Sequence, residues 1–433
     1  MLDRRLSRFL ICLAIGLRVG LILVLQSHTV PHSTYEHGEI AANLLASRGF
    51  SVKFLGADGP TSQQAPLYPA IVAAFYAIGG VETPRSLLFL QLAQAVLGGV
   101  LVAGVMALAR EITPDRPRSA IFAGLIAAVY PTLVYATTHN QVASLAATLL
   151  TWTLVFAYRA GRTNHGAIGA GICLGLLTLT DPILAVVAPA AVWAIAMVRG
   201  WRGAIRPVLV MGLLASLCVA PWIVRNAFVH GEFFFIKSSF GYAFWQGNCA
   251  LSEGTDKVVR SSVEVALKSG GTGLKGLNES LWKARHEAGY LDDIALTRED
   301  YQSLAKLSEP ARSRVLFRRA IDDLRADPTR YPRLCWRRLR YFVLFDETNP
   351  KTRSLLYRVP HATLTLMAVL GLILTPAGVR RGLGPTLLTA GLIAVCHALT
   401  IVSARFHIPI EPLMAVWAAG CLRVIQPRLP TTS

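Results

Sequence analysis

Long apolar runs alternate with short polar connections along most of this chain. A helix needs about 20 residues to cross ~30 Å of hydrocarbon at ~1.5 Å per residue, and most of the runs approach that length. The runs cover residues 9–25, 86–108, 120–135, 142–158, 166–179, 183–198, 208–224, 359–374, 386–402 and 409–422. The pattern predicts an all-α polytopic membrane protein with about ten transmembrane helices. Runs of this length exclude an outer-membrane barrel, whose strands are much shorter.

Composition strengthens this prediction. Of the 433 residues, 53% are hydrophobic and 16% are charged, and the mean hydropathy is +0.47. An average soluble domain has about 25% charged residues, so an ordinary cytosolic enzyme is excluded. The formal net charge of +18 would suggest nucleic acid in a soluble protein, but here the position of the charges decides, and we expect no nucleic-acid partner. The seven cysteines lie mostly within apolar runs; Cys249 and Cys335 could pair outside the membrane.

Basic residues concentrate in alternate connections, which sets an orientation. The connections after the second, fourth, sixth and eighth runs carry Arg110, Arg116, Arg118, Arg159, Arg162, Arg199, Arg202, Arg206, Arg380 and Arg381. The positive-inside rule assigns these connections to the cytoplasm. We therefore expect a multi-pass protein of the plasma (inner) membrane with both termini cytoplasmic. Arg18 interrupts the first run, which favours an uncleaved span over a signal peptide.

Two long segments then face outward, at 27–85 and 225–358. Within the first, 67–78 is apolar but short and contains Pro69, which predicts an interfacial or re-entrant helix. Within the second, 309–327 has helical apolar periodicity, which predicts a small helical cap. The expected domains are an N-terminal transmembrane module (1–224) that includes the catalytic first outer loop, an extracytoplasmic cap (225–358), and a C-terminal transmembrane module (359–433).

Helical spacing places Glu36, Glu39 and Asn43 on one face of a helix in the first outer loop, with Ile40 and Leu44 on the other. These carboxylates could face a substrate enclosed by the bundle. A solvated face of an amphipathic helix is the alternative, and it is the more common case for such a pattern taken alone.

Two outward arginines could bind an anion. Arg225 ends the seventh run after Pro221 and Trp222, where an ordinary membrane anchor is also expected. Arg405 lies in a charged connection between two outer helix ends, where positive charge is normally sparse. Arg18 lies inside the first span. We expect it to be either a functional group or a structural partner that forms a salt bridge or binds carbonyl groups within the bundle.

A series of motifs gives the chain a family resemblance. The series runs from the Glu-bearing segment through 43–51, Gly59-Pro60-Thr61, 65–69, Pro221-Trp222-x-x-Arg225-Asn226, 240–248 and 404–412. In this order it resembles the GT-C-fold glycosyltransferases, in particular the branch similar to protein O-mannosyltransferases and the lipid A aminoarabinose transferase. The resemblance covers nearly the whole chain and implies a GT-C-type bundle.

The resemblance implies transfer of a sugar from a polyprenyl-phosphate-linked donor to an extracytoplasmic acceptor (a lipid, glycan or protein of the envelope), with inversion. The family's essential acid lies in the first outer loop, which designates Glu36, with Glu39 second, as the base that takes the acceptor proton. The leaving phosphate needs fixed cationic donors. The available ones are Arg225, Arg405, Lys237 and His407. The expected sugar and substrate contacts are Tyr68, Asn226, Trp245 and Asn248.

Some positions depart from the family pattern. Ser33 stands where relatives often have Asp, and His139-Asn140-Gln141 replaces a second acidic site. Asp181-Pro182 stands where an Arg-Pro pair is common. Glu36, Glu39 and His407 could hold a divalent metal, but no spacing decides this.

Two other functions stay open. One is a carrier or flippase for polyprenyl-phosphate lipids, although the duplicated halves typical of transporters are not evident. The other is an inactive relative that binds an envelope partner.

Overall fold

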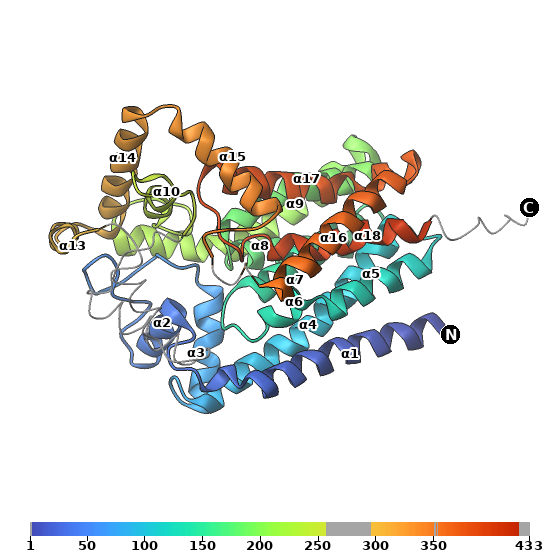
Figure 1. Ribbon diagram of the computed structural model, residues 1–433, viewed down its shortest axis with the longest axis horizontal. Helices are drawn as coiled ribbons and strands as arrows, with labels where there is room; N and C mark the ends of the chain where they lie inside the picture. Colours follow the sequence, from blue (N-terminus) through green and yellow to red (C-terminus); the bar gives the residue numbers. More distant parts are fainter. Residues whose placement is uncertain (1, 257–295, 350–351, 353, 424–433) are drawn as a thin grey trace, which may run out of the picture.

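The computed structural model describes residues 2–256, 296–349, 352 and 354–423 (Figure 1). Parts of the predicted cap and of the C-terminal module therefore lie outside the described residues. The described elements are helical, apart from isolated bridges. They are α1 (Leu2–Leu25), η1 (Ser27–Thr29), α2 (Tyr35–Leu45), α3 (Leu67–Gly79), α4 (Pro84–Ile112), α5 (Pro117–Val129), α6 (Pro131–Ala136), α7 (Ala143–Ala160), α8 (Asn164–Thr178), η2 (Pro182–Val187), α9 (Ala188–His230), α10 (Phe240–Asn248), α13 (Arg298–Ala305), α14 (Glu309–Ala326), α15 (Arg330–Val343), α16 (Leu355–Leu374), α17 (Ala377–Leu399), η4 (Ile408–Ile410), α18 (Glu411–Ala418) and η5 (Ala419–Arg423).

The all-α membrane character is confirmed, but the count of about ten spans is not. In the described part of the chain, 6 helical segments are long and apolar enough to cross a membrane. Three shorter apolar helices accompany them, at Leu67–Gly79, Pro117–Val129 and Ile408–Leu422. The sixth predicted run begins in η2, and its remainder is joined to the seventh run in α9, in which Gly200 has non-helical angles of φ 72° and ψ 160°. A positive φ of this kind suits glycine, so α9 is two helices joined at Gly200.

The third predicted run is broken, because proline interrupts its hydrogen bonds. Pro131 has no N–H and cannot donate to the carbonyl of Ala127, so α5 ends and α6 begins there. The buried guanidinium of Arg18 supplies the missing donors: Nη2 donates to the Ala127 carbonyl at 3.3 Å and Nη1 to that of Ala128 at 3.1 Å. Of the two roles expected for Arg18, the structure thus shows the carbonyl partner. Gly98 on α4 makes room, since a Cβ there would overlap Nε and Cδ of Arg18.

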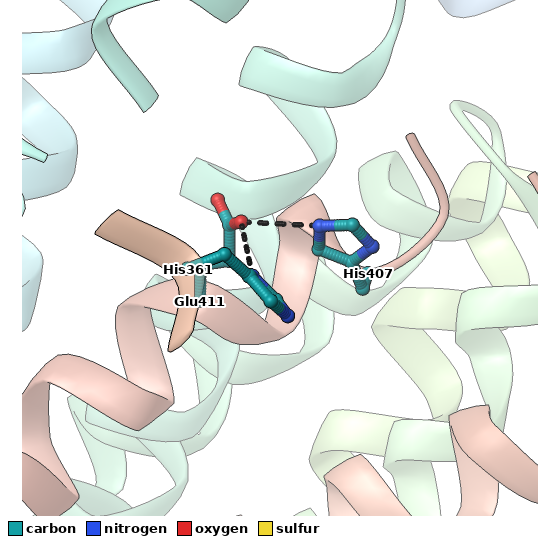
Figure 2. A group of neighbouring side chains, drawn as sticks. All are labelled: His361, His407 and Glu411. Atoms are coloured by element: carbon teal, nitrogen blue, oxygen red, sulfur yellow. Dashed lines mark ion pairs between the residues drawn. The ribbon is translucent and has the colours of Figure 1, made fainter. Parts of the chain in front are cut away.

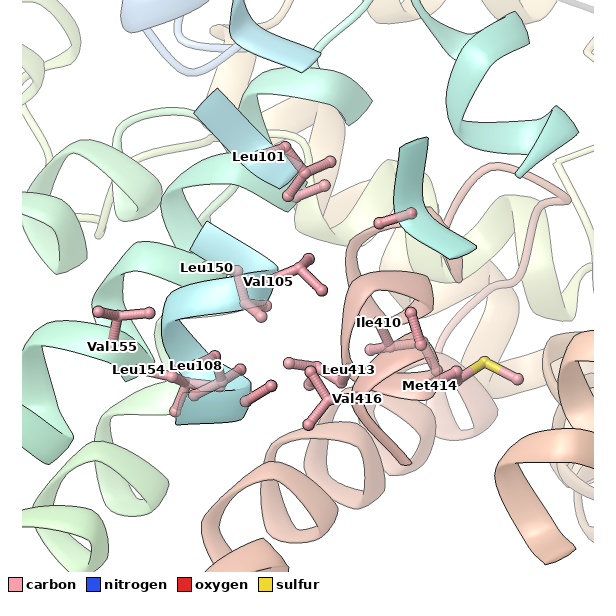
Figure 3. Packing of buried hydrophobic residues seen from close by; sticks show 14 of the residues in the cluster. Leu101, Val105, Leu108, Leu150, Leu154, Val155, Ile410, Leu413, Met414 and Val416 are labelled. Carbon is pink, nitrogen blue, oxygen red and sulfur yellow. The ribbon is translucent and has the colours of Figure 1, made fainter. Parts of the chain in front are cut away.

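The core of the bundle lies between α4, α7 and α18. Figure 3 shows Leu101, Val105 and Leu108 of α4 beside Leu150 and Leu154 of α7, facing residues of α18. Leu413, Leu150 and Leu154 are fully buried. Because α18 follows Arg405 and His407 in the chain, this packing fixes the segment that carries both.

The predicted cytoplasmic connections gather at one end of the bundle. Glu111 at the end of α4 accepts hydrogen bonds from Arg159 and Arg162, both at 2.8 Å. Arg110 donates to Ser7 near the start of α1, at 2.8 Å. The start of α1 and the end of η5 also lie toward this end, whereas α2, α10, α13 and α14 lie at the opposite one (Figure 1).

The opposite end is built from the two segments predicted to face outward. α14 begins at the predicted residue and ends one residue earlier, and it packs on α10 and on the first loop. One apolar cluster joins them and includes Ile40, Phe54, Tyr242 and Leu316. The predicted cap and the first outer loop therefore share a core.

Candidate active site

Helix α2 carries Glu36 and Glu39 and is held rigidly against α3. The ring of His37 lies 5.1 Å, edge-on, from that of Tyr68, and the hydroxyls of Thr34 and Tyr76 are 2.9 Å apart. Gly38 permits this close approach, because a Cβ there would collide with the Thr34 side chain. His37, Gly38, Ile40 and Ala41 are buried, while Glu36 and Glu39 are half-buried on the other face. The predicted division of the helix into two faces is therefore observed.

Charges from three separate segments act on His37. Burial has the largest effect and lowers the pKa of His37 to about 4. Glu36 raises this pKa, whereas Lys237 and Arg405 lower it. His37 is therefore neutral near pH 7. Because electrostatic effects decay with distance, these shifts indicate that Lys237 and Arg405 act on the part of α2 that carries Glu36 and His37.

Lys237 is the cation of this group that burial affects most. Its ammonium donates to Gln64 Oε1 at 3.1 Å. Burial lowers its pKa, Asp181 and Glu36 raise it, and Arg405 lowers it. The group therefore contains two carboxylates and two cations. They come from α2, the turn before η2, the segment after α9 and the segment before η4. We call Glu36, Asp181, Lys237 and Arg405 the charged cluster.

Arg405 lies on the exposed side of the charged cluster. Its guanidinium is 4.0 Å from Asp256 Oδ2, and the side chain remains largely exposed. The backbone of its segment is fixed, because Val402 accepts from Asp256 N at 3.1 Å and donates to Gly254 O at 3.2 Å. An exposed arginine on a fixed backbone is suited to contact an anion from outside.

Arg225 lies elsewhere, in a clamp on the first loop. It donates to Thr61 O at 2.7 Å, to Ser62 Oγ at 2.9 Å and to Phe50 O at 3.1 Å. Its guanidinium also lies over the rings of Trp222 and Phe50. These contacts give Arg225 a positioning role in the first loop.

A buried carboxylate of the cap completes this clamp. Glu309 accepts hydrogen bonds from Thr61 Oγ1 and Ser62 N, both at 2.7 Å, and from the Ser238 hydroxyl. Arg312, three residues further along α14, donates to Phe54 O at 2.7 Å. Glu309 therefore ties the first loop and the segment of Lys237 to the cap.

The predicted substrate contacts are buried. Tyr68 and Trp245 are 2% and 4% exposed, and the Tyr68 hydroxyl donates to Gln94 at 3.2 Å. Asn248 accepts from Arg338 at 2.6 Å and donates to Phe244 O at 2.8 Å. Asn226 donates to Ile236 O at 3.0 Å and accepts from Ser62 Oγ at 2.7 Å. All four side chains therefore lie in the packed interior, where the protein itself supplies their apolar contacts and hydrogen bonds.

The structure brings together two positions that depart from the family pattern. Asn140 Nδ2 donates to Ser33 Oγ at 2.9 Å. Where relatives are expected to place acids, this chain has a neutral hydrogen-bonded pair.

His407 lies away from Glu36 and Glu39, in a buried group with His361 and Glu411 (Figure 2). Among the described residues, the metal-ligand grouping that includes His407 contains neither carboxylate of α2. The Cys249–Cys335 pairing is also not observed, and all seven cysteines of the described chain are free.

Sequence reasoning missed the roles of Asp181, Asp256, Glu309 and His361. For His361 a signal existed, since an ionisable residue inside an apolar run marks a special site. For Glu309 no local signal existed, because its partner Thr61 is 248 residues away.

Comparisons with known proteins agree with this architecture. Residues 63–224 match the family described as dolichyl-phosphate-mannose-protein mannosyltransferase. The archaeal oligosaccharyltransferase AglB from Archaeoglobus fulgidus, in complex with an inhibitory peptide and a dolichol-phosphate, superimposes with a TM-score of 0.56 at 16% identity, covering 97% of this chain and 50% of that one. The form of the Archaeoglobus fulgidus enzyme tethered to an acceptor peptide gives 0.54 at 14% identity, with coverages of 97% and 49%. This chain thus spans about half the length of these structures.

ArnT from Cupriavidus metallidurans, bound to undecaprenyl phosphate, is similar at 15% identity, with coverages of 96% and 77%. Its TM-score is 0.43. No curated protein matches the sequence.

Proposed function

This chain has the GT-C fold, and on that premise we propose that it is an integral-membrane glycosyltransferase that moves a sugar from a polyprenyl-phosphate carrier to an acceptor outside the cytoplasm. The charged cluster is the observation that carries the proposal. It groups Glu36 and Asp181 with the cations Lys237 and Arg405. Helix α2, which carries Glu36, lies at the end of the bundle opposite the basic connections (Figure 1). By the positive-inside rule that end faces outward, with both termini in the cytoplasm of a plasma-membrane protein.

The proposed reaction needs one base and a stabilised leaving group. The acceptor hydroxyl attacks the anomeric carbon, its proton passes to Glu36, and the bond from that carbon to the phosphate oxygen breaks. The attack comes from the face opposite the phosphate, so the configuration inverts. The phosphate leaves with both electrons of that bond, and Lys237 and Arg405 stabilise its growing negative charge.

The clamp positions these groups. Arg225 and Glu309 hold the segment 50–62, Ser238 neighbours Lys237 in the chain, and Gln64 accepts from the Lys237 ammonium. We assign Arg225 to positioning rather than to phosphate binding, because its hydrogen bonds are made to the loop. His407 is also left out of phosphate binding, because it is buried in a group with His361 and Glu411. Glu39 remains the second choice for the base.

The test is sugar transfer from synthetic polyprenyl-phosphate sugars by the purified protein in nanodiscs. Glu36→Gln keeps the shape of the side chain and removes the base, so turnover is expected to fall ~10²–10⁴-fold with donor binding retained. Glu111→Gln is the matched control, since that carboxylate pairs with Arg159 and Arg162 at the other end of the bundle. Its turnover should be unchanged.

Two results would contradict the proposal. Full turnover in the Glu36→Gln, Glu39→Gln double variant would exclude a base on α2. Donor binding by the wild-type protein without any product, over a panel of hexose and pentose carriers and envelope acceptors, would favour the carrier or the inactive binding relative. Glycan and glycoprotein analysis of cells that lack the protein would identify the sugar and the acceptor.

A further inference from the structure

A second buried polar group lies between α16, α18 and the break between α5 and α6. It contains His361 of α16, His407 just before η4 and Glu411, the first residue of α18. Their side chains are 2% exposed or less. Glu411 Oε1 is 3.2 Å from His407 Nε2 and 4.0 Å from His361 Nδ1 (Figure 2). The proposed sugar transfer uses none of the three.

The group has more acceptors than hydrogens to satisfy them. His361 Nε2 lies 3.1 Å from the Val343 carbonyl and must donate to it, so Nδ1 of a neutral ring presents a lone pair to the group. The Tyr130 hydroxyl is 3.2 Å from Glu411 Oε1 and 3.3 Å from His361 Nδ1, and its single hydrogen can serve one of them. The Tyr357 hydroxyl lies 3.0 Å from His407 Nε2 and adds one hydrogen, but it contacts no oxygen of Glu411. Glu411 Oε2 and His407 Nδ1 are buried without a hydrogen-bond partner.

Such a deficit is costly in a buried site. An unsatisfied buried polar group costs about 1–3 kcal/mol, and more when it is charged. A metal cation accepts lone pairs from several ligand atoms at once, so one ion would supply a partner to both Glu411 and His361.

The donor set indicates the kind of cation. Two imidazoles and one carboxylate are the ligands of many zinc sites, whereas magnesium and calcium prefer oxygen alone. A ring nitrogen that donates to a backbone carbonyl, as His361 Nε2 does, fixes the tautomer in which the other nitrogen can bind metal. Tetrahedral zinc with bonds of about 2.0 Å separates its ligand atoms by about 3.3 Å. The ligand atoms of the three residues lie within 4.8 Å of one another, so small rotations close the site.

We propose that His361, His407 and Glu411 bind a divalent transition-metal ion of the zinc class. The ion joins α16 to the start of α18. It also fixes the segment that carries Arg405, two residues before His407. The three residues leave the fourth position of a tetrahedral ion to a water molecule or to the neighbouring Tyr130 hydroxyl, which lies 3.2 Å from Glu411 Oε1. The proposal does not depend on the proposed sugar transfer, because metal content is measured without substrate.

The first measurement is metal content of the full-length protein, purified in detergent without chelators, by inductively coupled plasma mass spectrometry. We expect about one equivalent of zinc per chain. His361→Gln, His407→Gln and Glu411→Gln should each lower zinc affinity at least about tenfold. His397→Gln is the matched control: His397 is also a buried histidine, but its Nδ1 contacts the Ile401 carbonyl and it lies outside the group. Its zinc content should equal that of the wild type.

A second measurement uses only the wild-type protein, so it tests the proposal even if the variants fail to fold. Wild-type protein is stripped with a chelator and titrated with Zn²⁺, and its unfolding temperature should rise; Co²⁺ should give the visible absorption of a tetrahedral site. If the wild type purifies without a divalent transition metal and neither titration produces a change, the proposal is overturned. Equal zinc loss in His397→Gln would also overturn the assignment to these residues.

Discussion

Replacing Glu309 with alanine should loosen the clamp between the cap and the first loop. Glu309 is 6% exposed and accepts from Thr61 Oγ1, Ser62 N and the Ser238 hydroxyl. Its loss therefore leaves these three donors without their common acceptor.

The expected cost follows from these contacts. Each buried donor left unsatisfied costs about 1–3 kcal/mol. The hydroxyls of Thr61 and Ser238 can rotate toward other acceptors, but the Ser62 N–H cannot. We therefore expect a local loss of about 3 kcal/mol, near the low end of the summed range. At 1.4 kcal/mol per tenfold change, the open population of the loop rises by about 100-fold.

Hydrogen–deuterium exchange with mass spectrometry measures this directly, since exchange by local opening follows the open population. Peptides that cover residues 50–64 and 236–245 should lose about 100-fold of their protection. Peptides from the centre of α4 should keep theirs.

Glu232→Ala is the matched control. Glu232 also bridges to α14, through Arg314, but both side chains are substantially exposed at 38% and 52%. Exposed pairs contribute about 0–1 kcal/mol, so protection should change less than about fivefold. Equal protection in Glu309→Ala and Glu232→Ala would refute the reasoning that burial makes Glu309 the stronger contact.

Two further predictions concern Lys237 and Gly98. Burial lowers the pKa of Lys237, so its ammonium loses its proton at a lower pH than an ordinary lysine near ~10.4. Affinity for polyprenyl phosphate, measured by calorimetry, should therefore fall as the pH rises through that lowered pKa. The Lys237→Arg variant should not show this fall. An identical pH profile in both proteins would contradict a role for Lys237 in phosphate binding. Gly98→Ala places a Cβ against Arg18 and should destabilise the bundle by about 1–3 kcal/mol in thermal unfolding. Gly212→Ala should not destabilise the bundle, because a Cβ there meets nothing within 4 Å. Equal unfolding temperatures for the two variants would show that the Arg18 side chain can move aside at no cost.

Local patterns predicted the helices well where a single apolar face or run decides, and less well where a proline divides a run. The amphipathic run at 309–327 became α14, because its apolar residues recur at helical spacing. The short apolar run at 67–78 became α3, while the run at 120–135 was divided at Pro131. The division followed from the missing N–H of proline, a local property that the hydropathy count overlooked.

The sequence by itself thus determined the membrane class, most helix positions, the two faces of α2 and the likeness to GT-C enzymes. Tertiary structure alone decided which charged side chains meet. Glu36 and Lys237 come from segments 201 residues apart by their numbers, and Glu309 reaches Thr61 across 248. Hydrophobic periodicity reports only which face of a helix is buried, whereas these pairings depend on which helix ends are neighbours after packing. For the same reason, the sequence offered His407 as a possible metal ligand together with Glu36 and Glu39, whereas the fold groups it with His361 and Glu411.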